Sequence, residues 1–197
     1  VTDKFKSEVE SDRLDAQFDL AAAALIGGLT HSLTIASGVG NPYFSVKFTG
    51  LGIDIGKHSI GHGGSFKDMS PGQLKVKIHK FHFQLMADLM KKLEAVPEGD
   101  GSMLDNTVIV YLSDAAEAHH SRCGQWPFVL IPGKNTGLQG GRYLDFPHYM
   151  QDGHREIGNL YTTLLHAAGE KREYFGVRDA MLKGPARGDG PLEALLA

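Results

Sequence analysis

Two short segments of the sequence gather residue types that can bind a divalent metal ion. In the first, D-I-G-K-H-S-I-G-H-G-G, Asp54, His58 and His62 recur every four residues. A carboxylate four residues before an imidazole can place oxygen and nitrogen donors on one side of a turn, and zinc accepts that mixture. The neighbouring glycines would let the backbone bend sharply near an ion. On spacing alone, a solvated Gly/His loop is the simpler interpretation.

The second segment, Y-L-S-D-A-A-E-A-H-H-S-R-C-G, follows a continuous apolar run. Its potential ligands are Asp114, Glu117, His119 and His120. A carboxylate at the end of a strand is held rigidly, as a metal site requires. The alternative is that Asp114 caps a turn and that the histidines are exposed. The clustering of ligand types favours the metal site here.

Later in the chain, His148 and His154 are two candidates for a further ligand, and the sequence does not choose between them. Lys134 and Arg142 lie in G-K-N-T-G-L-Q-G-G-R, and they are the best candidates for contacts to a phosphate or sulfate group. A plain glycine-rich turn is the alternative for that segment.

The remaining candidates favour simpler interpretations. His79 and His82 share one helix face, but lysines nearby disfavour a cation, so we expect surface or packing residues. Cys123 is the single cysteine, which excludes an internal disulfide, and a small loop residue is the favoured interpretation. Neither a G-x-S-x-G elbow nor a P-loop or G-x-G-x-x-G motif occurs.

The elements that must position these residues follow from hydrophobic spacing. The apolar run V-I-V-Y-L is typical of a parallel strand that is covered on both faces. Strands and helices alternate, which predicts a layered α/β fold with a mostly parallel sheet and flanking helices. Ligands of such sheets bind beyond the carboxyl ends of the strands, where Asp114 is expected. The expected elements are helices at about 11–26, 70–96 and 157–168, strands at 32–36, 105–114 and 127–133, and loops at 38–72.

Composition sets wider limits. The chain has 197 residues, 42% of them hydrophobic and 22% charged, and a net charge of -3. These values suit one globular domain, and the lack of a basic run argues against a nucleic-acid partner. No apolar run reaches the roughly 18 residues that a membrane span needs. The first residues, V-T-D-K-F-K-S-E-V-E-S, lack a Met and lead into a helix, so we expect a fragment of a longer protein.

Several segments resemble the alkaline phosphatase and sulfatase superfamily, and the resemblance covers nearly the whole chain. D-I-G-K-H-S-I-G-H resembles its Asp-x-x-x-His metal motif. D-N-T-V-I-V-Y-L-S-D, Q-W-P-F-V-L-I-P-G and E-I-G-N-L-Y-T-T-L-L-H-A-A-G resemble its later strands and closing helix, in the same order. P-E-G-D-G-S-M-L-D-N-T, G-G-R-Y-L-D-F-P and G-P-L-E-A-L resemble an uncharacterised, mostly exported family within it, the domain-of-unknown-function family 1552.

The resemblance implies a metal-dependent hydrolase of small-molecule or glycan phosphate or sulfate esters, in the periplasm or outside the cell. It also implies an alkaline-phosphatase-like fold in which residues 1–197 form one partial domain without its N-terminal part. Asp54 and His58 would bind one ion, Asp114 would bind a second ion or bridge, and His154 or His148 would supply the late histidine. Zinc is the favoured metal, with calcium and manganese as alternatives.

Two departures from the superfamily's pattern matter. Ala115 follows Asp114 where the superfamily often has His or Asn-Gly, and His119 or His120 would have to substitute. The nucleophile is expected upstream of this chain, which would then be inactive by itself. One rival hypothesis is a non-catalytic secreted or cell-envelope protein that keeps the fold. A second rival is a cytosolic interaction domain with incidental histidines. The sequence gives no oligomeric state.

Overall fold

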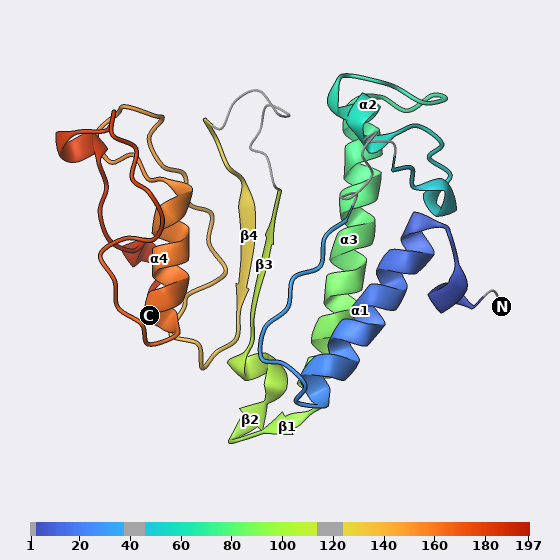
Figure 1. The fold of residues 1–197 in the computed structure, drawn as a ribbon, viewed down its shortest axis with the longest axis horizontal. Helices are drawn as coiled ribbons and strands as arrows, with labels where there is room; N and C mark the ends of the chain where they lie inside the picture. Colours follow the sequence, from blue (N-terminus) through green and yellow to red (C-terminus); the bar gives the residue numbers. More distant parts are fainter. Residues whose placement is uncertain (1–2, 38–45, 114–123) are drawn as a thin grey trace. The chain divides into compact units, whose positions relative to one another are not determined.

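The computed structural model describes residues 3–37, 46–113 and 124–197. Contacts between residues divide the chain into two compact units, Val1–Met103 and Leu104–Ala197, called here the N-terminal and C-terminal units (Figure 1). The expectation that residues 1–197 form one partial domain stays a prediction.

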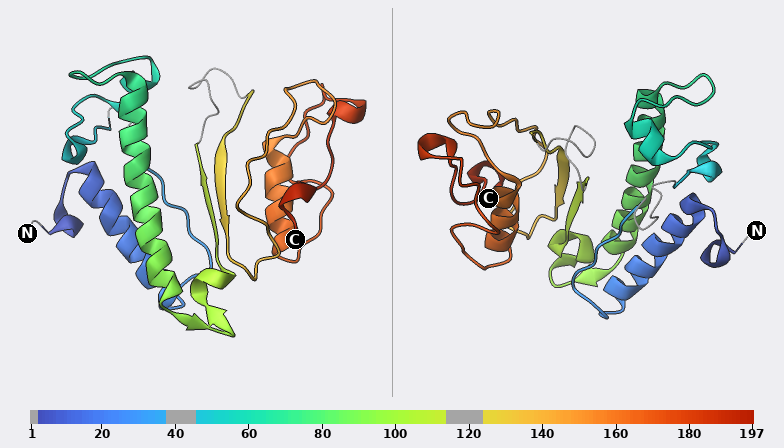
Figure 2. Two further views of the ribbon diagram at one scale, coloured as in Figure 1. Left: turned by 180° about the vertical axis from the view of Figure 1, so that it is seen from behind. Right: turned by 45° about the horizontal axis from the view of Figure 1, so that its top comes forward.

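Two long helices dominate the N-terminal unit, and they pack along each other in both views of Figure 2. They are α1 (Glu10–Ile26) and α3 (Pro71–Glu94). Ser70 and Gln73 form a capping box at the start of α3, and Pro71 occupies its first turn. The buried residues of α3 recur at helical spacing and are Leu74, Ile78, His82, Leu85, Met86, Leu89 and Leu93. A small antiparallel hairpin of β1 (Pro97–Glu98) and β2 (Gly101–Ser102) follows α3.

A second part of the same unit carries the segment of interest. The short helix α2 (Lys57–Gly61) lies over one end of α3, and the short helix η2 (Thr49–Leu51) contacts α1 (Figure 1). They are held by a cluster of buried side chains, consisting of Phe48, Ile53, Ile60, Leu74 and Ile78. Burial of each large apolar side chain contributes about 1.5–3 kcal/mol, so this cluster fixes α2 on α3.

The described part of the C-terminal unit contains one two-stranded sheet and one α-helix. β3 (Val108–Leu112) and β4 (Phe128–Pro132) pair in the antiparallel sense, with Val110 opposite Leu130. Phe128 and Leu130 of the sheet pack against a core that includes α4 (Ile157–Ala167) and the C-terminal segment. The buried members of that core are Leu160, Leu192 and Leu195.

The predicted fold class is wrong. The described residues form four α-helices and two antiparallel two-stranded sheets, and not a layered, mostly parallel sheet of the alkaline-phosphatase type. An apolar run predicts a strand but not its direction, and every residue of β3 is only half-buried. Residues 32–36 form no strand, and most of them are exposed. The Thr30 side chain bonds both the backbone N–H and the carbonyl of Ser32, which makes a local turn instead.

No helix in the described part of the chain combines the length and the apolar character that a membrane crossing requires.

Candidate functional site

Two of the predicted metal ligands meet on α2. His58 and the C-capping residue His62 are four positions apart, which places them on one face of the helix. Their Nε2 atoms are 3.1 Å apart, and their rings meet edge to face with centroids 4.6 Å apart. The structure therefore brings two imidazole nitrogens to one point.

Glycines after α2 fix the end of the helix and with it the position of His62. Gly63 has a φ of 88°, a left-handed conformation that glycine adopts without strain. Its N–H donates to the Ile60 carbonyl at 3.1 Å, and the Gly64 N–H donates to the Ser59 carbonyl at 2.8 Å. These two bonds form a Schellman cap. A Cβ on Gly64 would lie 2.7 Å from the Ser59 carbonyl oxygen. The Gly-Gly pair thus ends α2, and that role was not predicted from the sequence.

The spacing of the two nitrogens suits a shared metal ion. Zinc binds imidazole nitrogen at roughly 2.0–2.1 Å. The two Nε2 atoms are 3.1 Å apart. An ion at the zinc–nitrogen distance from each of them would have an N–metal–N angle of about 100°, which is near the tetrahedral value. Without an ion, a proton on one Nε2 joins the two rings by a hydrogen bond. Metal binding would displace that proton.

Asp54 does not join the histidine pair. Its carboxylate pairs with the Lys47 ammonium at 2.8 Å, and the side chains are 62% and 47% exposed. Exposed pairs of this kind contribute about 0–1 kcal/mol, so the pair holds Asp54 weakly. Over residues 3–37, 46–113 and 124–197, no three His, Cys, Asp or Glu side chains converge as a metal site. Binding of one ion by Asp54 and His58 together stays a prediction.

The strand-end candidates lie outside the described residues. They are Asp114, Glu117, His119 and His120. Cys123, which was predicted to be a small loop residue, also lies outside the described residues.

Of the two late histidines, His154 is the one oriented by the fold. It is 9% exposed, and its Nδ1 lies 3.0 Å from the Pro147 carbonyl oxygen. A carbonyl can only accept, so the Nδ1 N–H donates this bond and Nε2 takes no part in it. Metal-binding histidines are commonly oriented in this way. His148 is exposed.

The two cations predicted to bind an anion both have partners within the C-terminal unit. The Lys134 ammonium lies 3.0 Å from the Asp105 carboxylate. The Arg142 guanidinium donates to the Ala194 carbonyl at 2.7 Å and to the Gln139 side chain. The Lys134–Asp105 and Arg142–Ala194 contacts join segments that are distant in sequence, which gives each cation a structural role beside the predicted one.

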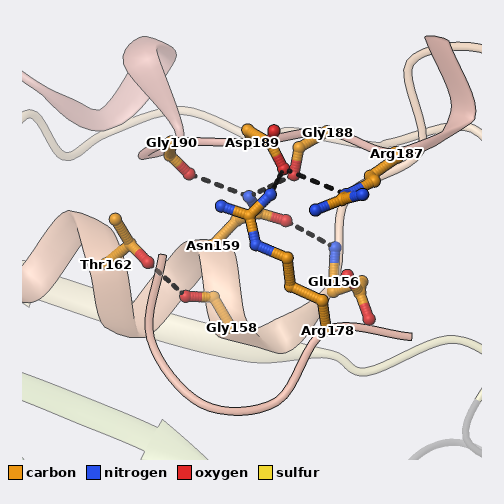
Figure 3. Close-up of polar contacts among 9 residues, drawn as sticks. All are labelled: Glu156, Gly158, Asn159, Thr162, Arg178, Arg187, Gly188, Asp189 and Gly190. Carbon is orange, nitrogen blue, oxygen red and sulfur yellow. Dashed lines mark hydrogen bonds and ion pairs between the residues drawn. The ribbon is translucent and has the colours of Figure 1, made fainter. Parts of the chain in front are cut away.

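A buried polar network on α4 was not predicted from the sequence (Figure 3). The Asn159 side chain is fully buried and donates to the carbonyls of Gly188 and Gly190, each at 2.8 Å. Its Oδ1 accepts from the Glu156 N–H at 2.7 Å. These bonds fasten the C-terminal segment to the start of α4. The stretch Asn-Leu-Tyr-Thr-Thr could have indicated this network, because it places polar side chains on the buried face of an apolar helix.

His82 was predicted as a surface or packing residue, and it is 6% exposed. Its Nε2 lies 3.1 Å from the Ser37 hydroxyl. Burial lowers the pKa of His82 to about 4, and the positive charge of Lys57 adds to that shift. Burial and the same lysine also lower the pKa of His79. Because His82 is buried and its Nε2 is paired with the Ser37 hydroxyl, it serves the interior of this unit.

Comparison of the chain with protein-family models, with curated proteins and with solved structures finds no match in any of the three.

Proposed function

We propose that this chain supplies the His58–His62 pair to the zinc site of an exported, metal-dependent hydrolase-like protein acting on phosphate or sulfate esters. The observation that carries the proposal is the 3.1 Å separation of the two Nε2 atoms. The hydrolase class and the exported location are supported by the resemblance of the sequence segments alone. A bound ion would lower the pKa of a water or alcohol nucleophile and stabilise charge on the transferring group.

Further metal ligands would come from residues close in sequence to His58 and His62, or from the ligands that the sequence predicts in other segments. Asp54 is the nearest candidate in sequence. Its exposed ion pair with Lys47 can open at small cost, which would release the carboxylate for an ion. Manganese and calcium are weaker candidates than zinc, because both prefer oxygen ligands over imidazole.

A second candidate function is a non-catalytic secreted or cell-envelope protein. It is favoured by one observation, namely that no third ligand converges on the pair within the described residues. A site with two histidines could then hold a structural ion without turnover.

Calorimetric titration of the chain with zinc, manganese and calcium chlorides tests the proposal. We expect zinc to bind with a stoichiometry near one. Either His58→Ala or His62→Ala should weaken binding by more than the roughly 10–100-fold that loss of an outer-shell partner produces. His31→Ala is the matched control, since His31 is an exposed histidine of the same unit. A folded chain that binds no zinc, or equal losses in all three variants, would overturn the site.

Hydrolysis separates the two candidate functions. The chain is assayed, zinc-loaded and together with the upstream nucleophile segment that the superfamily resemblance implies, with p-nitrophenyl phosphate and p-nitrophenyl sulfate, in parallel with its His58→Ala variant. Turnover that depends on zinc and is lost in the variant supports the hydrolase. Stoichiometric zinc without turnover of either ester favours the non-catalytic protein.

A further inference from the structure

The C-terminal unit contains a cavity that lies apart in sequence from the histidine pair of α2. Its volume is about 530 Å³, and all of its lining residues fall between Gly124 and Leu195. Small-molecule sites in proteins typically measure about 300–1,000 Å³. The cavity is therefore large enough for a ligand of one or two rings.

The cavity has an apolar floor that the fold has already ordered. Leu160, Leu192 and Leu195 line it, and they are 1%, 3% and 5% exposed. Phe128 of β4 belongs to the same core cluster and also lines the cavity. Since these side chains are packed in the core, binding would not require them to be ordered.

Two aromatic residues line the cavity nearer to the solvent. The Trp126 indole N–H donates to the Ser113 carbonyl at 2.8 Å, which anchors the ring at the end of β3. Tyr143 is 90% exposed. Tyr and Trp offer large rigid contact surfaces at low entropic cost, and exposure of such a surface is typical of binding sites.

Polar groups with unused hydrogen-bonding capacity complete the lining. The side chains of Asp145 and His148 make no hydrogen bond or ion pair with any residue that the structure describes. Arg142 is fixed through the Ala194 carbonyl and Gln139, and it keeps further N–H donors. Donors and acceptors beside an apolar floor provide specificity for a ligand that is polar at its edges.

The charges of the lining balance. Arg142 and Arg155 oppose Asp145 and Glu156. A site for a phosphate or sulfate would carry a cationic excess. A neutral ligand with an apolar face and polar edges fits this lining better than an anion does, and a pyranose ring has that character.

From this geometry we infer that the cavity of the C-terminal unit is a binding site for a neutral saccharide. The apolar C–H face of a sugar ring packs on Tyr143 and Trp126, and its hydroxyl groups bond to Asp145, His148 and Arg142. The inference does not depend on the proposed metal site, because every residue that it uses lies in the C-terminal unit.

Trp126 is the sole tryptophan of the chain, so its fluorescence reports occupancy of the cavity directly. The full chain is titrated with chitotetraose, cellotetraose, xylotetraose and mannotetraose, each up to about 10 mM, which is tenfold above a Kd of about 1 mM. Sodium phosphate and sodium sulfate are titrated in parallel. We expect a saturable change with at least one tetrasaccharide and none with either anion.

Variants place the binding in the cavity. Tyr143→Ala should weaken binding about fivefold or more, while Tyr143→Phe should keep it, because an aromatic contact contributes about 1 kcal/mol. Asp145→Asn should weaken binding, and Asp152→Asn is its matched control, because Asp152 is exposed and lies outside the lining. Because the Tyr143 side chain is 90% exposed, Tyr143→Ala is not expected to unfold the C-terminal unit, and urea unfolding followed by Trp126 fluorescence checks this.

Three results would overturn the inference. The first is the absence of a saturable change with all four tetrasaccharides. The second is saturable binding of phosphate or sulfate that excludes the sugar. The third is a sugar affinity that Tyr143→Ala and Asp145→Asn leave unchanged. None of these results bears on zinc binding, so failure here is distinct from failure of the metal site.

Discussion

At the scale of single residues, His82 shows how burial changes the chemistry of a side chain. It lies on the buried face of α3, and its Nε2 is paired with the Ser37 hydroxyl. A protonated imidazole at this place would lose its solvation, beside the positive charge of Lys57. The neutral ring can accept from Ser37, which ties residue 37 to the helix across 45 positions of sequence.

The pKa of His82 predicts an acid-sensitive N-terminal unit. The folded pKa is about 4 against 6.5 for the unfolded chain, so the unfolded state binds more protons between these values. The free energy of unfolding should therefore fall as pH is lowered through this window, by up to about 3 kcal/mol, and no further below the folded pKa. Urea unfolding at several pH values measures this dependence.

The matched comparison is between His82→Gln and His31→Gln. In His82→Gln we expect a weaker fall in stability between about pH 6.5 and pH 4, because the buried titrating group is gone. The exposed His31→Gln variant should follow the wild type. Parallel pH profiles for all three proteins would contradict the assignment to His82.

At the scale of elements, the sequence predicts what depends on local signals. Helical spacing and caps place α1, α3 and α4 within a few residues of their observed bounds, and the capping box of Ser70 and Gln73 marks the start of α3. The two apolar strands are also found as β3 and β4. Strand direction depends on partners that are distant in sequence, and here the prediction is wrong.

The candidate site shows the same division between local and distant information. The i,i+4 spacing of His58 and His62 was visible, because a single helical turn converts it into proximity. The pairing of Asp54 with Lys47 and the burial of His82 depend on the tertiary fold, and no spacing rule contains them. Asn159 was missed because a polar residue in an apolar helix does not identify its partners.

The cap of α2 gives a prediction at this scale. Gly63→Ala should lower the free energy of unfolding of the N-terminal unit by about 1 kcal/mol, because alanine is strained at a φ of 88°. It should also weaken zinc binding, since His62 precedes the altered residue. Urea unfolding and zinc titration measure both effects.

Gly72→Ala is the matched control for that prediction. Gly72 lies in the first turn of α3, and the nearest atom to its added Cβ would be 4.0 Å away. Alanine there should be neutral or stabilise the unit by about 0.5–1 kcal/mol. Equal losses from both substitutions would show that the left-handed conformation of Gly63 is not the cause.

At the scale of the whole molecule, each compact unit has buried side chains of its own. The N-terminal unit is organised around the cluster that includes Ile60 and Leu74, and the C-terminal unit around Leu160 and Leu192. Domains with their own cores can unfold in separate steps, and a single free energy of unfolding then describes neither. The proposed metal pair and the proposed saccharide cavity belong to different units.

Two spectroscopic probes can follow the units separately. Trp126 fluorescence reports the C-terminal unit alone. Circular dichroism reports mainly the N-terminal unit, whose α1 and α3 have 17 and 24 residues against 11 in α4.

Asn159→Ala should lower the free energy of unfolding measured by fluorescence by about 2–4 kcal/mol, because it leaves two carbonyls and an N–H without their partner. The transition measured by circular dichroism should hardly move. Asn135→Ala, at an exposed amide of the same unit, should change neither. Equal shifts of both transitions in Asn159→Ala would mean that the two units unfold as one cooperative body, as the single-domain prediction requires.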